Sequence, residues 1–430
     1  MRQEKDNVKG IQLLLASVLL TVAAKGHCQQ ITGQQVEALK PFDDLMTEFV
    51  RTHQAPGAAL AVTKNGRLVY ARGFGWANLE DKIPVQPDSI FRIASISKPI
   101  TAVAILQLVE KGKLRLDDKV FDILKYTPHL EPGCKADPRL KDITILHLLH
   151  HTAGWDRAES FAPMGIEGTL KIADALGVSP PGQQSDIIRY MMGLPLDFDP
   201  GTKVVYSNFG YLLLGRVIEK ITGQTYEDYV KRNVLGPLGI TEMRIGRTAK
   251  EHRAPKEVTY YDERGRTTTA RFGPQAGKTV PLPYARCVEI MDSHGGWIAS
   301  AIDLARFSVA FDHPARCKIL TEESIKKMFA RPAGVGGYDP NSEPLPAYYA
   351  CGWDVRPKGD GKQNTWHKGG IEGTSALLVR RYDGLNWAVL FNTHGNPEGK
   401  SLSDLIDHPL HPAANSVTTW PQQDFFPSYR

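Results

Sequence analysis

Ser95 and Lys98 place a hydroxyl and an amine three residues apart, in the stretch Ser-Ile-Ser-Lys. Pro99 follows early in an apolar run with a period of about 3.6 residues that ends at Gly112, so the sequence predicts a buried helix beginning near Ser95. Both side chains then share one face. A lysine in a poorly hydrated pocket loses basicity and can take the proton of a serine hydroxyl, which is otherwise a poor nucleophile. The pair therefore predicts nucleophilic catalysis, helped by the N–H groups of the helix N-terminus.

The spacing Ser-x-x-Lys is not specific by itself. A second copy, Ser324 to Lys327, lies in Thr-Glu-Glu-Ser-Ile-Lys-Lys-Met-Phe and is typical of a capped, solvated helix. Taken alone, Ser95 also fits a helix-capping serine followed by a surface lysine. The choice between these interpretations depends on partners elsewhere in the chain.

Two further stretches carry chemistry in a fixed order along the chain. Tyr206-Ser-Asn208 follows the turn-forming Pro200-Gly201 and precedes a predicted helix, and it is the only Tyr-x-Asn in the sequence. His367-Lys-Gly369-Gly370 lies on a predicted strand near the C-terminus. Together with Ser95 and Lys98 they supply a nucleophile, two groups that exchange protons, and glycines that permit close backbone approach.

These three motifs resemble the signature Ser-x-x-Lys, Tyr-x-Asn and Lys/His-x-Gly of the penicillin-recognising serine hydrolases, in the branch of class C β-lactamases, DD-peptidases and family VIII carboxylesterases. The resemblance covers about residues 35 to 395. The other stretches that carry it are Phe91-Arg-Ile-Ala94, Ile143-Thr-Ile-Leu-His-Leu-Leu-His-His-Thr-Ala-Gly154, Pro237-Leu-Gly239, Gly295-Gly296 and Asp303-Leu-Ala-Arg-Phe307.

The resemblance implies a role for each motif residue. Ser95 would form an acyl-enzyme, and Lys98 and Tyr206 would share the proton transfers without the sequence saying which is the base. We expect the lysine charge to lower the pKa of Tyr206 and burial to lower that of Lys98. Asn208, His367, Gly369 and Gly370 are the expected substrate-binding residues, with the backbone N–H groups of Ser95 and Gly370 as the oxyanion hole.

The third motif departs from the lactamase pattern, because His367 occupies the position at which class C β-lactamases are expected to have lysine. Lys368 is adjacent, but neighbouring residues of a strand face opposite ways, and we predict that His367 points into the cleft. A histidine is a weaker fixed charge for a β-lactam carboxylate. The resemblance therefore implies a serine hydrolase for an amide, peptide or ester bond.

Three alternatives to this interpretation remain. The first is a β-lactamase or DD-carboxypeptidase proper, the second is acyl transfer instead of hydrolysis, and the third is a non-catalytic binding protein of the same fold. The mechanism needs no cofactor or metal, and His147, His150 and His151 lack a carboxylate in a zinc-binding pattern. Four tryptophans fit a cleft or the core equally well and are left out of the site; they are Trp155, Trp297, Trp353 and Trp366.

Length and charge exclude other classes of protein. At 430 residues with a net charge of +5 and no block of like charge, the chain is globular and needs neither nucleic acid nor an anionic membrane as partner. The expected partner is a small molecule or peptide with an acyl group. Residues 1–28 resemble a secretory signal peptide, because Arg2, Lys5 and Lys9 precede an apolar run that is too short to span a bilayer comfortably. The alternative is an N-terminal anchor that is not cleaved. We therefore predict export to the periplasm or outside the cell, with no stable membrane span after cleavage.

Export leaves four cysteines, which could form two disulfides with any of three connectivities; they are Cys134, Cys287, Cys317 and Cys351. No CxxC spacing occurs, so a structural zinc site is not expected.

The order of predicted elements indicates an α+β fold. Asn65-Gly66 predicts a hairpin, and further strands are expected at residues 350–355, 365–368, 374–381 and 386–392, with an extended segment or hairpin near 259–269. Strands at both ends and helices between them predict an antiparallel sheet flanked by helices, as in the β-lactamase/transpeptidase-like α/β sandwich, with an inserted helical domain. The expected parts are the sheet part at 29–125 and 290–400, the helical part at 126–289 and a C-terminal tail at 401–430.

Overall fold

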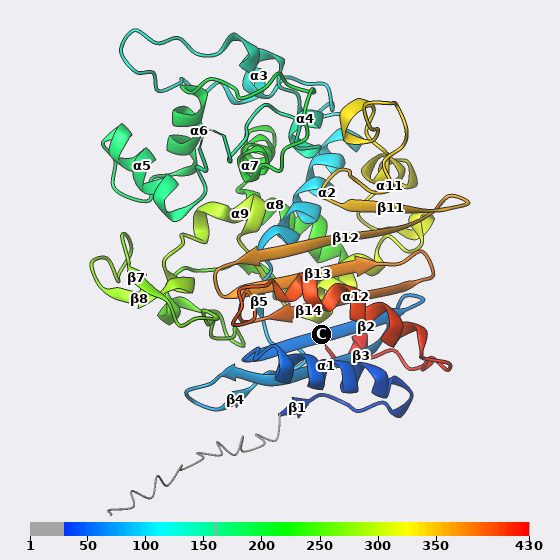
Figure 1. Ribbon diagram of the computed structural model, residues 1–430. Coiled ribbons are helices and arrows are strands. Elements are labelled where there is room, and N and C mark those ends of the chain that lie inside the picture. Colours follow the sequence, from blue (N-terminus) through cyan, green and yellow to red (C-terminus); the bar gives the residue numbers. More distant parts are fainter. Residues whose placement is uncertain (1–29, 160, 430) are drawn as a thin grey trace, which may run out of the picture.

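An antiparallel sheet of nine strands organises the computed structural model, which describes residues 30–159 and 161–429 (Figure 1). The strands follow the order β1-β3-β2-β14-β13-β12-β11-β10, with β4 paired to β3. The predicted signal peptide and Cys28 lie outside the described residues. The sheet strands are β1 Ile31–Thr32, β2 Gly57–Lys64, β3 Arg67–Asn78, β4 Ile83–Pro84, β10 Tyr348–Tyr349, β11 Asp354–Gly359, β12 Lys362–Ile371, β13 Thr374–Arg380 and β14 Leu385–Phe391.

The two ends of the chain meet in the middle of this sheet. β2 and β3 form the predicted hairpin, and both turn residues, Asn65 and Gly66, have positive φ (50° and 80°), as a tight hairpin turn requires. β14 pairs with β2 from Leu385 opposite Lys64 to Phe391 opposite Ala58. The α+β fold with an antiparallel sheet is therefore confirmed.

Helices cover both faces of the sheet. α1 (Lys40–Thr52) and α12 (Leu402–Asn415) pack together on one face, where Phe42, Trp387 and Leu410 belong to one buried apolar cluster (Figure 1). α12 lies in the segment for which the sequence predicts only a tail. On the other face α2 (Ser97–Glu110), α10 (Ala301–Val309) and α11 (Glu322–Phe329) contribute to a larger core. Most of α2 is buried, because apolar side chains surround its whole circumference.

The remaining helices gather at one end of the sheet, around α7 (Figure 1). They are α3 Val120–Leu124, α4 Ile145–Leu149, α5 Ile166–Leu176, α6 Gln184–Met192, α7 Asn208–Thr222, α8 Tyr226–Val230 and α9 Asp292–Gly295. Two small sheets complete the structure, formed by β5 Phe91–Arg92, β9 Trp297–Ala299 and β6 Arg244–Ile245, and by β7 Thr267–Thr269 with β8 Thr279–Pro281.

Of the extended segment or hairpin expected near 259–269, the hairpin does not form, because Thr259 and Tyr261 bond instead to the backbone of Ala77 and Asn392, and β7 pairs with β8. The four cysteines of the described residues form no disulfide. Cys351 is buried and its Sγ lies 3.6 Å from Nε2 of His150. Within the described residues, no helix has both the length and the apolar character that a membrane span requires.

Candidate active site

Ser95 lies in a 3₁₀ turn, Ala94–Ile96, that leads directly into α2. Ala94 has φ of 45°, in the left-handed region that an alanine rarely adopts. The hydroxyl of Ser97 donates to the carbonyl of Ala94 at 2.7 Å and holds this turn closed. The helix therefore begins two residues later than its predicted start, and Ser95 stands at the junction. Such backbone strain is common where a reactive side chain must be presented.

Lys98 lies one turn into this segment and is fully buried. Its Nζ lies 3.1 Å from Oγ of Ser95, 2.8 Å from Oδ1 of Asn208 and 2.8 Å from the carbonyl oxygen of His294. Burial, reinforced by the positive charge of Arg157, holds the pKa of Lys98 well below its usual value. The expected depression of the lysine pKa is thus present, and it favours the neutral amine.

Tyr206 and Asn208 come from the loop that enters α7, where Ser207 caps the helix by accepting from the N–H of Gly210 at 3.1 Å. Nζ of Lys98 lies 4.7 Å from the centre of the Tyr206 ring. Burial raises the pKa of Tyr206 above its usual value, and the Ser95 hydroxyl opposes this only in part. The expectation that the phenol pKa would be lowered is wrong, because the lysine beside it is itself desolvated.

An aromatic cluster behind Tyr206 was not predicted as part of the site. The ring of His151 lies 4.4 Å from that of Tyr206 and 4.5 Å from that of Tyr349, and its Nδ1 accepts from the N–H of Ser207 at 3.1 Å. His151 is buried, with a pKa lowered well below the usual value by burial. His151 is therefore a neutral ring that helps to fix the loop of Tyr206.

On β12, His367 and Lys368 face opposite sides of the sheet. Lys368 forms ion pairs with Asp404 and Asp407 of α12, at 2.9 and 3.4 Å. His367 lies on the side of Tyr206, its ring centre 6.5 Å from that of the tyrosine, but it is only 3% exposed. Its Nδ1 lies 2.6 Å from the Lys368 carbonyl and its Nε2 lies 3.0 Å from the hydroxyl of Tyr349.

The bonding of His367 restricts what this histidine can do. A neutral imidazole that donates from Nδ1 to the carbonyl can accept at Nε2 from the tyrosine, so both ring nitrogens are engaged. Burial and the nearby Lys98 lower the pKa of His367 to about 3. At neutral pH the third motif therefore presents an uncharged side chain. Gly369 and Gly370 follow it, and Gly370 lines a pocket together with Tyr206 and Asn208.

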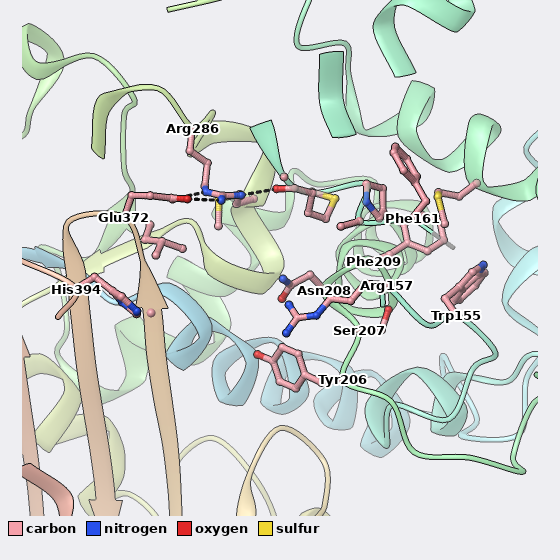
Figure 2. A pocket seen from close by; sticks show the side chains of 18 of the residues that line it. Trp155, Arg157, Phe161, Tyr206, Ser207, Asn208, Phe209, Arg286, Glu372 and His394 are labelled. Carbon is pink, nitrogen blue, oxygen red and sulfur yellow. Dashed lines mark hydrogen bonds and ion pairs between the residues drawn. The ribbon is translucent and has the colours of Figure 1, made fainter. Parts of the chain in front are cut away.

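This pocket has a volume of 440 Å³ and opens between the sheet and the helical group (Figure 2). Arg286 crosses it: Nε and Nη2 donate to the carboxylate of Glu372, each at 2.7 Å, and Nη1 donates to the Met164 carbonyl at 2.7 Å. Through these bonds Arg286 links the β12–β13 loop, which carries Glu372, to the segment before α5, which carries Met164. The apolar wall consists of Trp155, Phe161, Met164, Met191, Phe209 and Met291.

Three of the seven predicted site residues, Tyr206, Asn208 and Gly370, line this pocket. The other four lie beside them: Lys98 contacts Ser95 and Asn208, the His367 ring lies near that of Tyr206, and Gly369 packs against the Ser95 turn. Sequence reasoning missed Arg157, Arg286, Glu372 and His394 in the lining, and it set Trp155 aside. Spacing offers no signal for these residues, since they come from separate loops. In residues 30–159 and 161–429, no three His, Cys, Asp or Glu side chains gather in a way that could hold a metal ion.

Comparisons with known proteins show the family of this chain. A family model described as Beta-lactamase matches residues 42–410. Penicillin-binding protein 4* of Bacillus subtilis (strain 168) is 28% identical over 353 residues, covering 80% of this chain and 69% of that protein. Protein flp of Staphylococcus aureus (strain N315) is 24% identical over 345 residues, and the match covers 80% of this chain but only 60% of flp. The octameric penicillin-binding protein homologue from Pyrococcus abyssi has 26% identity and a TM-score of 0.63, covering 87% of this chain and 77% of that one.

Proposed function

We propose that this chain, which belongs to the β-lactamase family, is a serine hydrolase that cleaves an amide, peptide or ester bond through an acyl-enzyme on Ser95. The observation that carries this proposal is the surroundings of the Lys98 amine. Two of its three neighbours, Oδ1 of Asn208 and the His294 carbonyl, can only accept hydrogen bonds, whereas the Ser95 hydroxyl can also donate.

The protonation state of Lys98 follows from this arrangement. A neutral amine has two N–H groups, which the two carbonyl oxygens would take, and one lone pair, which would then face Oγ of Ser95. The lowered pKa favours that neutral form. We therefore assign Lys98 as the base that takes the serine proton when Oγ attacks the acyl carbon.

Tyr206 has the complementary property. Its raised pKa keeps the phenol protonated at neutral pH, which suits delivery of a proton to the leaving group. We propose that the proton taken by Lys98 then returns to Tyr206, whose ring centre lies 4.7 Å from the amine. Asn208 has its Oδ1 on Lys98, which leaves its amide N–H groups for the substrate. The backbone N–H groups of Ser95 and Gly370 remain the proposed oxyanion hole.

The substrate-binding side favours an ester or amide hydrolase over a β-lactamase or DD-carboxypeptidase proper. At the third motif a neutral, fully engaged His367 replaces a fixed cation, so a carboxylate gains no charge pairing there. We further propose that the protein is exported, which residues 1–28 support by composition, and N-terminal sequencing of the secreted form would locate the cleavage site.

A labelling experiment tests the proposal. The purified protein is treated with a fluorophosphonate probe and with p-nitrophenyl butyrate, and the adduct is located by intact-mass and peptide spectrometry. We expect one adduct on Ser95 and ester turnover, both absent in Ser95→Ala. Ser324→Ala is the matched control, since Ser324 begins the second Ser-x-x-Lys and lies in α11, away from the pocket. Labelling that persists in Ser95→Ala, or a wild-type protein with neither adduct nor turnover, contradicts the proposal, and the latter result favours the non-catalytic binding protein.

A further inference from the structure

Three arginines line the pocket, and two of them are already paired. Arg286 is held by Glu372 in the two-bond contact described above. Arg266 forms ion pairs with Asp262 and Glu263, at 2.8 and 2.7 Å. The third, Arg157, is exposed, and its guanidinium forms no hydrogen bond or ion pair within the described residues. Arg157 is therefore the arginine of the lining that has no partner for its charge.

Arg157 lies beside the proposed catalytic groups. Its Cζ is 6.0 Å from the centre of the Tyr206 ring, and Figure 2 shows the side chain reaching between Tyr206 and Asn208. Its charge is close enough to lower the pKa of Lys98. A group bound by this guanidinium would consequently lie near a substrate whose acyl carbon is at Ser95.

The opposite wall offers no competing site for an anion. His367 is neutral at pH 7 with both ring nitrogens engaged, and Lys368 lies on the far face of the sheet with Asp404 and Asp407. Glu372, the carboxylate of the lining, is neutralised by Arg286. Among the arginines of the lining, Arg157 is therefore the one with no carboxylate partner in the described residues that would compete with an anionic ligand.

We propose that Arg157 binds a carboxylate of the substrate, so that this hydrolase prefers esters or amides that carry a negative charge close to the scissile bond. The inference rests on the proposed function of Ser95. A guanidinium offers a planar pair of N–H donors that matches a carboxylate, and the apolar residues Trp155, Phe161 and Phe209 on the same wall strengthen that contact by excluding water.

Two matched pairs of esters test the preference and locate the charge. The first pair is p-nitrophenyl hydrogen glutarate and its methyl ester, with the carboxylate on the acyl side. The second is the butyryl ester of para-hydroxybenzoate and that of methyl para-hydroxybenzoate, with the carboxylate on the leaving group. The measured quantity is the ratio of kcat/KM for the anionic and the neutral ester of each pair, in the wild type, Arg157→Gln and Arg157→Lys.

For at least one pair we expect the ratio to fall about ten-fold in Arg157→Gln, since a hydrogen bond to a charged group is worth roughly that factor. Arg157→Lys should keep part of the ratio, and raised salt should lower it in the wild type. Arg232→Gln is the control, because Arg232 is exposed on the segment after α8 and does not line the pocket. Ratios unchanged in Arg157→Gln for both pairs overturn the inference while leaving Ser95-dependent turnover intact.

Binding of the esters to a variant that cannot hydrolyse them is an independent test of the inference. In Ser95→Ala, quenching of tryptophan fluorescence reports on the pocket, since Trp155 is part of its wall. We expect the anionic ester of the responding pair to bind about ten-fold more weakly when Arg157→Gln is added, again with Arg232→Gln as control. Equal binding of the anionic and neutral esters in Ser95→Ala contradicts the inference, even if no ester is hydrolysed by the wild type.

Discussion

The backbone of Gly369 lies directly against the turn that carries Ser95. A β carbon at position 369 would stand 2.2 Å from the carbonyl oxygen of Ile93 and 3.3 Å from the backbone nitrogen of Ser95. Both neighbours are backbone atoms, which cannot rotate away as a side chain can. The strand β12 and the Ser95 turn are therefore fitted to each other only when residue 369 has no side chain.

This fit makes Gly369→Ala a sensitive substitution. We expect the overpacked strand to move away from the turn, which should cost about 1–3 kcal/mol of stability and lower ester kcat/KM at least ten-fold. Thermal melting and steady-state kinetics measure the two effects. Gly165→Ala is the control for the melting temperature alone, since its β carbon would meet the nearest atom, the Ala162 carbonyl oxygen, at an ordinary 3.5 Å, but Gly165 lines the pocket. Wild-type rates in Gly369→Ala would contradict the assignment of this strand to the site.

We expect Lys98 to be needed for activity but not for stability. Lys98→Met removes the proposed base, and we predict a loss of ester turnover of about 10³-fold. The same change removes a buried amine whose burial is unfavourable for the charged form, so the melting temperature should stay or rise. Lys327→Met, in the second Ser-x-x-Lys, should leave the turnover unchanged. A variant that is destabilised yet active would argue for a structural lysine.

The pH dependence of the rate should follow Lys98. Because the neutral amine is the proposed base, kcat/KM should rise with pH through a pKa well below the usual lysine value, and the raised pKa of Tyr206 should keep the alkaline limb above the usual tyrosine range. Arg157→Gln removes a positive charge that lowers the Lys98 pKa, so the rising limb should move to higher pH. The pH profile of a neutral ester measures this shift. If the pKa of the rising limb is the same in Arg157→Gln and the wild type, the charge of Arg157 does not influence the pKa of Lys98.

Buried histidines should make the fold sensitive to acid. The pKa values of His367 and His150 lie at about 3 and about 4, both lowered mainly by burial. Below the unfolded value near 6.5, only the unfolded chain takes up these protons, so stability present above pH 6.5 is lost as pH falls. Below pH 6.5, each histidine then lowers the free energy of unfolding by about 1.4 kcal/mol per pH unit. Burial raises the pKa of Asp354 to about 6, which acts in the opposite direction, because the folded protein takes up this proton at a higher pH than the unfolded chain.

Denaturant unfolding at pH 7.5 and pH 5.5 measures this loss. We expect His150→Gln to be less sensitive to acid than the wild type, because one of the groups that titrate on unfolding is gone. His252→Gln should behave as the wild type, since His252 is exposed. Equal stability at the two pH values would show that these rings do not stay neutral in the fold.

The cysteines should behave as free thiols. Cys134 is exposed, whereas burial raises the pKa of Cys287 and Cys351 to about 12 and holds them as thiols. We expect rapid labelling of Cys134 in the native protein, slower labelling of the partly buried Cys287 and Cys317, and labelling of Cys351 only on unfolding, with a melting temperature unaffected by reductant. An intact mass lower by pairs of hydrogens would instead reveal disulfides.

The sequence alone determined the residues that can do chemistry and the kind of fold that holds them. Ser95, Lys98, Tyr206 and Asn208 stand in local motifs, each within a few residues of a helix start, where spacing fixes which side chains share a face. The Asn65-Gly66 hairpin and the C-terminal strands were equally readable, because turn residues and alternating burial are local properties.

Only the tertiary structure decided the electrostatics of the site and the shape of its pocket. The pKa of Tyr206 moves opposite to expectation because the phenol is buried. Burial and Lys98 keep His367 neutral, and its Nε2 lies against the hydroxyl of Tyr349, which no spacing connects to it. Arg157 meets Tyr206 across two loops. Such long-range relations depend on how separate elements pack, and the chain order of the residues does not encode them in any local pattern.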